Sequence, residues 1–184
     1  ATTEIYTLSL HDALPISVLG ADAVAKSNPD GYTILMGTST PLAINATLHK
    51  KLPYDPAKDF VPLALIATVP FVLVVNNDVP AKTVGEFIAL AKSKPNAFSY
   101  GTTGPGTPFH LYAELFSSMT GIQMVHVPYK GAGPAVIDMV GGQVQMGFTA
   151  LPSSIQHARA GRLRAIAVTS VKRPMCSSFV VLEG

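Results

Sequence analysis

Residues 98–110 read FSYGTTGPGTPFH, in which a short apolar strand passes through a glycine-rich turn into a helix. Thr107 is a common helix cap whose hydroxyl can accept from a free backbone N–H, and Pro108 suits the first helical position. The turn therefore aims unpaired N–H groups and a positive helix dipole at one point, which suits a carboxylate or a phosphate. A tight turn that binds nothing fits the same residues, so the local sequence leaves both interpretations open.

Strands and helices alternate on both sides of this stretch. Strands are expected at 32–36 (short and buried), 71–76, 98–100, 122–127, 144–149 and 163–169, and a further apolar run lies at 61–68. Helices are expected at 18–27, after a Thr83/Glu86 capping box, from Thr107 to a stop at Gly121, at 135–140 and at 152–160. In the helix after Thr107, a buried face is predicted at Leu111, Leu115 and Met119, which recur every four residues. This alternation predicts an α/β fold with a largely parallel sheet, whose ligands bind beyond the carboxyl ends of the strands.

Two further turns have similar chemistry. GTSTP at 37–41 follows the strand at 32–36, and Thr40 with Pro41 repeats the pairing of a cap residue with a proline. PYKGAGP at 128–134 precedes the helix at 135–140 and contains Lys130, which can hold an anion or simply face solvent. Three polar turns after strands indicate a binding edge.

Composition excludes several classes of protein. The chain has 184 residues, of which 48% are hydrophobic and 13% charged, so a compact fold is expected instead of disorder. A formal charge of +2 without a basic run argues against nucleic acid, and no apolar run approaches the roughly 20 residues of a membrane span. Cys176 is the single cysteine, which excludes an internal disulfide and a cysteine-based zinc site.

Catalytic and metal motifs are missing from the sequence. It has no G-x-S-x-G, H-E-x-x-H or G-x-x-x-x-G-K-[ST] pattern, and its histidines lack metal-ligand spacing. His110 is expected to bond the helix start more readily than a ligand, Tyr129 to pack beneath its turn, and Asp138 to face solvent. No nucleophile, base and orienting group can be assembled, so we expect a binding protein that needs no metal or cofactor, and not an enzyme.

Five collinear runs between about residues 18 and 173 resemble the substrate-binding proteins of tripartite tricarboxylate transporters, also called Bug or TctC proteins. The runs are PDGYTILM (29–36), YDPAKDFVPLALIATVPFVLVVN (54–76), YGTTGPGTPFHLYAELF (100–116), HVPYKGAGPAVIDMVGGQV (126–144) and AGRLRAIAVTSVKR (160–173). HVPYKG together with the PDGYT and YDPAKDF segments is specific to this family.

The resemblance implies a periplasmic receptor of the type II binding-protein class, in which two α/β lobes close like a clamshell on a small organic acid. It places lobe I at 17–70 with 170–184, lobe II at 77–162, and the crossing strands at 71–76 and 163–169. It also implies membrane transporter subunits as partners. The receptor itself is not expected to span a membrane.

Family members hold di- and tricarboxylates, acidic amino acids or nicotinate-like acids through backbone N–H groups, small hydroxyls and bridging waters. Matched residue by residue, the resemblance implies ligand contacts from lobe I at Thr38 and Ser39. From lobe II it implies contacts at Thr102, Thr103, Gly104, Gly106 and Thr107. Tyr129, Lys130, Gly131, Thr149 and Ala150 are second-rank candidates.

The ends of the chain depart from the family pattern. Residues 1–16 match nothing in it and lack the features of a signal peptide, and residues 174–184 do not match either. We therefore expect a fragment with an incomplete first lobe, exposed apolar sheet surface and weak or absent ligand binding. Thr149-Ala150 also replaces an acidic or amide pair that many members carry, which affects selectivity.

Two other functions fit the same clamshell. A sensory module would dock its closed lobes onto a signalling partner instead of a transporter. An enzyme acting on an organic acid would use Lys130 or His110 as its acid or base, and would lose turnover in Lys130→Ala.

Overall fold

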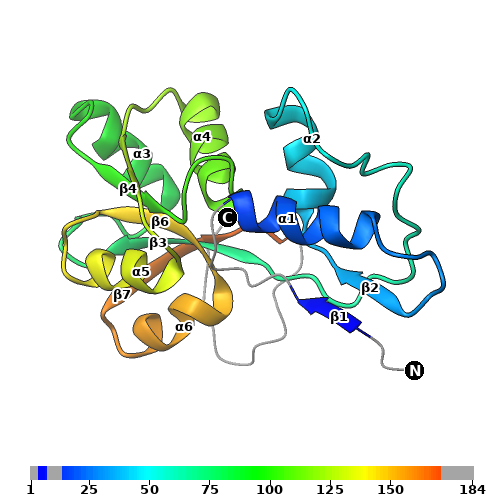
Figure 1. Ribbon diagram of the computed structural model, residues 1–184. Coiled ribbons are helices and arrows are strands. Elements are labelled where there is room, and N and C mark those ends of the chain that lie inside the picture. The colour runs from blue at the N-terminus through cyan, green and yellow to red at the C-terminus, as the bar shows by residue number, and fades with distance from the viewer. Residues whose placement is uncertain (1–3, 8–13, 171–184) are drawn as a thin grey trace.

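The computed structural model describes residues 4–7 and 14–170 (Figure 1). These residues form a two-stranded parallel sheet, β1 (Glu4–Thr7) with β2 (Thr33–Met36), and a separate five-stranded sheet. Figure 1 shows the two sheets as neighbouring bodies joined by an extended stretch of chain. In the segment at 1–16, which does not match the family, residues 4–7 form β1. The other non-matching segment, residues 174–184 with Cys176, lies outside the described part.

The smaller body also holds α1 (Leu14–Ala25), a π-helical turn η1 (Thr40–Ile44) and α2 (Asn45–Leu48). The strand predicted at 32–36 is present from Thr33, but it is not buried, because Ile34 is 36% and Met36 44% exposed. Among the described residues β2 pairs only with β1, so its apolar side chains have less to pack against.

The apolar run at 61–68 does not form a strand. Residues 60–70 have no regular structure, and the side chains of Val61, Leu63, Leu65 and Ile66 are 75–83% exposed. Apolar residues of this kind form a strand only where a neighbour accepts their backbone bonds, and no described strand pairs with this segment.

The larger sheet has the strand order β5-β4-β6-β3-β7, with strands β3 (Phe71–Asn76), β4 (Ser99–Thr102), β5 (Val125–Pro128), β6 (Met146–Ala150) and β7 (Leu163–Val168). β4 is parallel to both β5 and β6, as predicted. β3 runs antiparallel to both β6 and β7, so the sheet is mixed. Because Phe71 pairs with Ala150, β3 begins at the edge where β6 ends.

Helices cover both faces of this sheet, giving three layers (Figure 1). α3 (Val84–Ser93) and α4 (Pro108–Thr120) lie on one face, and α5 (Ala132–Val140) and α6 (Leu151–Arg159) lie on the other. β3 separates the two cores because its side chains alternate, with Leu73 and Val75 in one cluster and Val72 and Val74 in the other. A strand buried on both faces explains the continuous apolar run at 71–75.

The buried face predicted for α4 is wrong. Leu111, Leu115 and Met119 are 36%, 55% and 77% exposed. The inward face instead carries a mainly aromatic stripe with the spacing i, i+3, i+4 and i+7, made of Phe109, Tyr112, Ala113 and Phe116. Its rings pack on Phe71 and Phe148 of the sheet, with centroids 5.0–6.0 Å apart. Large aromatic side chains bury more area than leucine or methionine, so this stripe faces the core.

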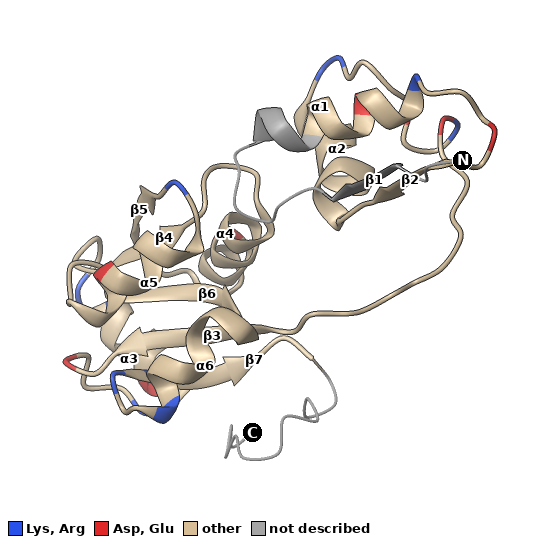
Figure 2. Ribbon diagram, turned by 60° about the horizontal axis from the view of Figure 1, so that its bottom comes forward, with Lys and Arg blue, Asp and Glu red and all other residues tan. Residues whose placement is uncertain are grey.

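Other local predictions hold with small changes. The Thr83 hydroxyl accepts from Glu86 N–H as expected for a capping box, although the Glu86 carboxylate accepts from Lys82 N–H and not from the cap residue. The helix expected at 135–140 begins at Ala132, and the strand expected at 122–127 begins at Val125. Figure 2 shows that charged residues lie mostly in turns and at helix ends, away from the sheet.

Candidate functional site

The carboxyl ends of three parallel strands meet at one edge of the larger sheet. β4 ends at Thr102, β5 at Pro128 and β6 at Ala150, and each is followed by the N-terminus of a helix, α4, α5 or α6. Helix N-termini carry a partial positive charge and free N–H groups, so three of them on one edge favour an anion there. Two of the three predicted polar turns, at 101–106 and 128–134, lie at this edge, whereas the turn at 37–41 follows β2 in the smaller body.

A small hollow lies at this edge, between β4, β6 and the helices α4 and α5. Its lining combines three threonines with apolar and glycine residues: Gly101, Thr102, Thr103, Phe109, Ala132, Ala135, Met139, Phe148 and Thr149. No lysine or arginine belongs to this lining. An anion in the hollow would consequently depend on hydroxyl groups, backbone N–H groups and helix dipoles.

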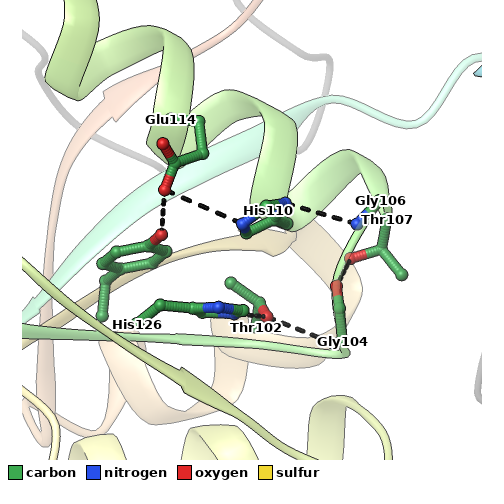
Figure 3. A network of polar contacts seen from close by, with 8 residues as sticks. Thr102, Gly104, Gly106, Thr107, His110, Glu114 and His126 are labelled. Atoms are coloured by element: carbon green, nitrogen blue, oxygen red, sulfur yellow. Dashed lines mark hydrogen bonds and ion pairs between the residues drawn. The ribbon is translucent and has the colours of Figure 1, made fainter. Parts of the chain in front are cut away.

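Thr102 and Thr103 differ in how their hydroxyl groups are used, although both are buried. Thr102 Oγ1 accepts from Gly104 N–H at 3.1 Å and lies 2.6 Å from Nε2 of His126 (Figure 3). The Thr103 hydroxyl has no hydrogen bond to any described residue. Of Thr102, Thr103 and Thr107, Thr103 is thus the one whose hydroxyl bonds no described residue.

Thr107 precedes α4 as predicted, but its hydroxyl does not cap the helix. It donates to Gly104 O at 2.8 Å, across the turn, instead of accepting from a helical N–H. Gly104 has φ 117°, a conformation that side-chain-bearing residues rarely adopt, which explains the glycine at this position. The hydroxyl closes the turn and leaves the first N–H groups of α4 without a side-chain cap.

His110 makes the local bond that was predicted for it. Its Nδ1 accepts from Gly106 N–H at 3.3 Å, and its Nε2 lies 3.7 Å from the Glu114 carboxylate (Figure 3). The Tyr100 hydroxyl donates to the same carboxylate, and burial together with Glu114 raises the pKa of Tyr100 well above its usual value. These groups form one connected network beneath the turn.

His126 completes this network from β5. Its ring stacks on Tyr100 with centroids 5.0 Å apart, and the His110 ring lies 4.5 Å away. Burial, and secondly the neighbouring His110, lower the pKa of His126, although Glu114 partly opposes this. Sequence reasoning missed His126 because 24 positions separate it from Thr102, and only the pairing of β4 with β5 brings the two together.

The second-rank residues at the start of α5 have separate surroundings. The Tyr129 hydroxyl donates to Asp138 at 2.8 Å, and burial followed by this bond raises the pKa of Tyr129 to about 12. Asp138 was expected to face solvent, but it is only partly exposed and accepts a hydrogen bond from Tyr129. Lys130 is exposed, and Gly131 is buried directly before the first residue of α5.

At the end of β6, Thr149 lines the hollow, and its hydroxyl donates to Ser154 Oγ at 2.8 Å. Ala150 precedes α6 without a side-chain cap. Ser154 is fully buried, and its role was not predicted because a serine inside a helix gives no distinctive sequence signal.

Thr38 and Ser39 lie in the smaller body, after β2, and none of the residues that line the hollow comes from that body. The structure does not bring these two residues to the hollow. The helical turn that follows begins one residue earlier than predicted: Ser39 precedes it, and Thr40 is its first residue and not its cap.

Residues 4–7 and 14–170 contain neither a candidate metal-binding cluster nor a membrane-spanning helix. No group of three or more histidine, cysteine, aspartate and glutamate side chains is arranged to hold a metal ion in this part of the chain. Every helix in the same residues is too short or too polar to cross a lipid bilayer.

Comparison with known proteins gives consistent results. The family model described as the tripartite tricarboxylate transporter family receptor (TctC) matches residues 15–178. Protein BugT of Bordetella pertussis is 40% identical over 157 residues, which are 85% of this chain and 48% of BugT.

Solved structures have the same fold. An R. palustris protein with adipate superimposes with a TM-score of 0.76 at 39% identity, over 85% of this chain and 52% of its own. MatC from Rhodopseudomonas palustris with bound malate gives a TM-score of 0.72 at 28% identity, over 85% and 53%. The chain spans about half the length of each of these proteins.

Proposed function

Because this chain belongs to the family of tripartite tricarboxylate transporter receptors, we propose that it captures a small organic carboxylate for a transporter of that kind. Family membership confirms the resemblance seen in the sequence, and the likeness to solved binding proteins confirms the predicted α/β fold class. A receptor binds without chemical turnover, which agrees with the expectation that the protein is not an enzyme. We propose that it acts in the periplasm and that its partners are the membrane subunits of the transporter.

The observation that supports this proposal most strongly is that β4, β5 and β6 end at one edge of the sheet, each before the N-terminus of a helix, with Thr102 and Thr103 in the first of these turns. A receptor must release its cargo, and a buried salt bridge carries a large desolvation penalty that neutral groups avoid. Each hydrogen bond contributes only about 0.5–1.5 kcal/mol net, so several convergent donors are required. We propose that Thr103, the backbone of the turn that follows it and the start of α5 supply these donors together.

The chemistry of the relatives points to the same class of ligand. One solved relative is described with adipate and another with bound malate, both of which are dicarboxylates. We therefore propose a dicarboxylate of similar size as the ligand, with one carboxylate group held by the turn at 102–107.

The test is a thermal-shift screen with adipate, malate and other dicarboxylates on the parent chain, Thr103→Val and Thr120→Val. A ligand at a hundred times its dissociation constant should stabilise the parent by about 2.7 kcal/mol, which raises the melting temperature by several degrees. Thr103→Val should melt close to the parent without ligand, because its hydroxyl has no partner among the described residues, but should lose most of the ligand shift.

Thr120→Val is the matched control, since it also removes one hydroxyl, at the far end of α4. It should keep the full ligand shift. Because an incomplete first lobe is expected to weaken binding, each acid is titrated to its highest soluble concentration, and no shift of the parent even there would contradict capture by this chain. An equal shift in the parent and in Thr103→Val would contradict the proposed site.

A further inference from the structure

Two histidines lie directly beneath the turn proposed to hold the carboxylate. His126 extends from β5 and His110 from the first turn of α4, and their ring centroids are 4.5 Å apart. Nε2 of His126 lies 2.6 Å from the hydroxyl oxygen of Thr102 (Figure 3). Within the described residues, the other groups that face this pair are Tyr100 from β4 and Glu114 from α4.

The Thr102 hydroxyl can serve His126 in two ways. A hydroxyl has one proton to donate and two lone pairs to accept with, and Gly104 N–H already uses one of these lone pairs. With a neutral His126 that carries its proton on Nδ1, Thr102 donates its proton to Nε2. With a protonated His126, Nε2–H donates to the second lone pair of Thr102, and the hydroxyl proton is released for another acceptor.

The Thr102 hydroxyl can accommodate an added proton on His126. His110 Nδ1 accepts from Gly106 N–H at 3.3 Å, which assigns the ring proton to Nε2, on the side of Glu114. His126 gains a proton without losing a partner, because Thr102 can accept as well as donate.

An anion bound at the hollow would stabilise an added proton on His126. The lining contains no lysine or arginine, so a carboxylate there meets dipoles but no formal positive charge from these residues. An imidazolium directly behind Thr102 would supply that charge. Starting from the neutral form protonated on Nδ1, it would also release the hydroxyl proton of Thr102, a residue that lines the hollow.

We propose that His126 is a positioning residue for the binding turn, and that its protonation couples capture of a carboxylate to proton uptake. This inference rests on the proposed function, because it assigns a regulator to the same site. His126 touches Thr102 and does not line the hollow itself, so it acts on the ligand through the threonine.

The direction of the pH dependence follows from the surroundings of His126. Burial and the neighbouring His110 lower its pKa, so the free protein holds His126 mainly neutral at pH 7. A bound anion favours the imidazolium and raises that pKa. Affinity therefore increases as pH falls from 8 to 6, by about tenfold for each pKa unit by which the ligand raises His126.

The experiment is isothermal titration calorimetry of the chain with adipate and malate at pH 6, 7 and 8, in two buffers of different ionisation enthalpy. We expect net proton uptake on binding at pH 7 and affinity that is several-fold higher at pH 6 than at pH 8. His126→Asn should bind with little pH dependence and no proton uptake. His49→Asn, which alters an exposed histidine on the smaller body, should behave like the parent.

A second readout uses the parent chain alone, so it does not depend on the folding of His126→Asn. In an NMR pH titration, the Gly104 amide should follow the titration of the His126 ring, since both groups bond Thr102 Oγ1. A Gly104 amide chemical shift that does not change as the His126 ring titrates would overturn the inference. Binding that is equally strong at all three pH values would overturn it while leaving the proposed function intact, whereas no binding at any pH would remove both.

Discussion

At the scale of single residues, Gly147 shows how closely the wall of the hollow is packed. A Cβ at this position of β6 would lie 2.9 Å from Met139 Sδ and 3.2 Å from Gly101 O. Met139 and Gly101 both line the hollow, so a methyl group would displace its wall. Glycine is required here by contact, and not by an unusual backbone angle.

Gly147→Ala is therefore predicted to lower the free energy of unfolding by about 1–3 kcal/mol, the usual penalty of overpacking. Gly85→Ala is the matched control, because nothing lies within 4 Å of a Cβ at that position of α3. Alanine favours helix over glycine, so this variant should gain up to about 1 kcal/mol. Urea denaturation of both variants measures the difference, and equal effects would contradict the packing described here.

Residue identity predicted the position of the binding turn better than it predicted its hydrogen bonds. Thr107 stands directly before α4 as expected, yet its hydroxyl bonds Gly104 O across the turn. Local sequence cannot decide whether this hydroxyl bonds a helical N–H or Gly104 O. The outcome depends on the backbone conformation of the turn, in which Gly104 and Gly106 have positive φ. The contact of Thr102 with His126 was likewise unpredictable, because it depends on the pairing of β4 with β5.

At the scale of elements, α4 has two apolar stripes and only one of them is buried. The aromatic rings on the inward stripe contact Phe71, Phe87 and Phe148, whereas Leu115 on the other stripe is 55% exposed. Helical periodicity fits both stripes. The prediction selected the stripe with the more regular four-residue spacing, and this stripe is the exposed one. Side-chain size against the available sheet surface decides the orientation.

Leu115→Gln is predicted to change the free energy of unfolding by less than about 0.5 kcal/mol, as expected for an exposed position. Phe116→Ala on the same helix should lower it by about 2–3 kcal/mol, somewhat less than for a fully buried phenylalanine, since its ring is only partly buried. Thermal or urea unfolding distinguishes the two variants. A larger loss in Leu115→Gln than in Phe116→Ala would reverse the assignment of the faces.

Elements were predictable where strong local signals agree with the fold. The capping residue Thr83, the αL stop at Gly121 and the apolar run of β3 all appear where expected. The segment at 61–68 has an equally apolar sequence but no regular structure. A strand needs a partner as well as a suitable sequence, and no described strand accepts its backbone bonds.

At the scale of the whole molecule, the two bodies differ in how much apolar surface they bury. The five-stranded sheet is covered on both faces and contains both hydrophobic clusters. The smaller body pairs two strands and exposes Ile34 and Met36, and the apolar segment at 61–66 is exposed as well. Regions with fewer buried contacts open at lower free energy.

Hydrogen exchange should therefore divide the chain into two parts. Amides of β3 and β6 are predicted to exchange only through the largest unfolding events, and amides of β2 and α1 at least about a hundredfold faster relative to their intrinsic rates. Mass spectrometry of peptic fragments measures both sets in one experiment. Equal protection of the two bodies would show that they unfold as a single cooperative unit.

The most direct test of carboxylate capture at the ends of β4, β5 and β6 is an NMR titration of the nitrogen-15-labelled chain with adipate and with malate. We predict that the amides of Thr103, Gly104, Gly106 and Ala132 shift together with one dissociation constant, while those at the C-terminal ends of α3 and α4 stay fixed. Shifts confined to other parts of the molecule, or none with either acid at millimolar concentration, would contradict the account.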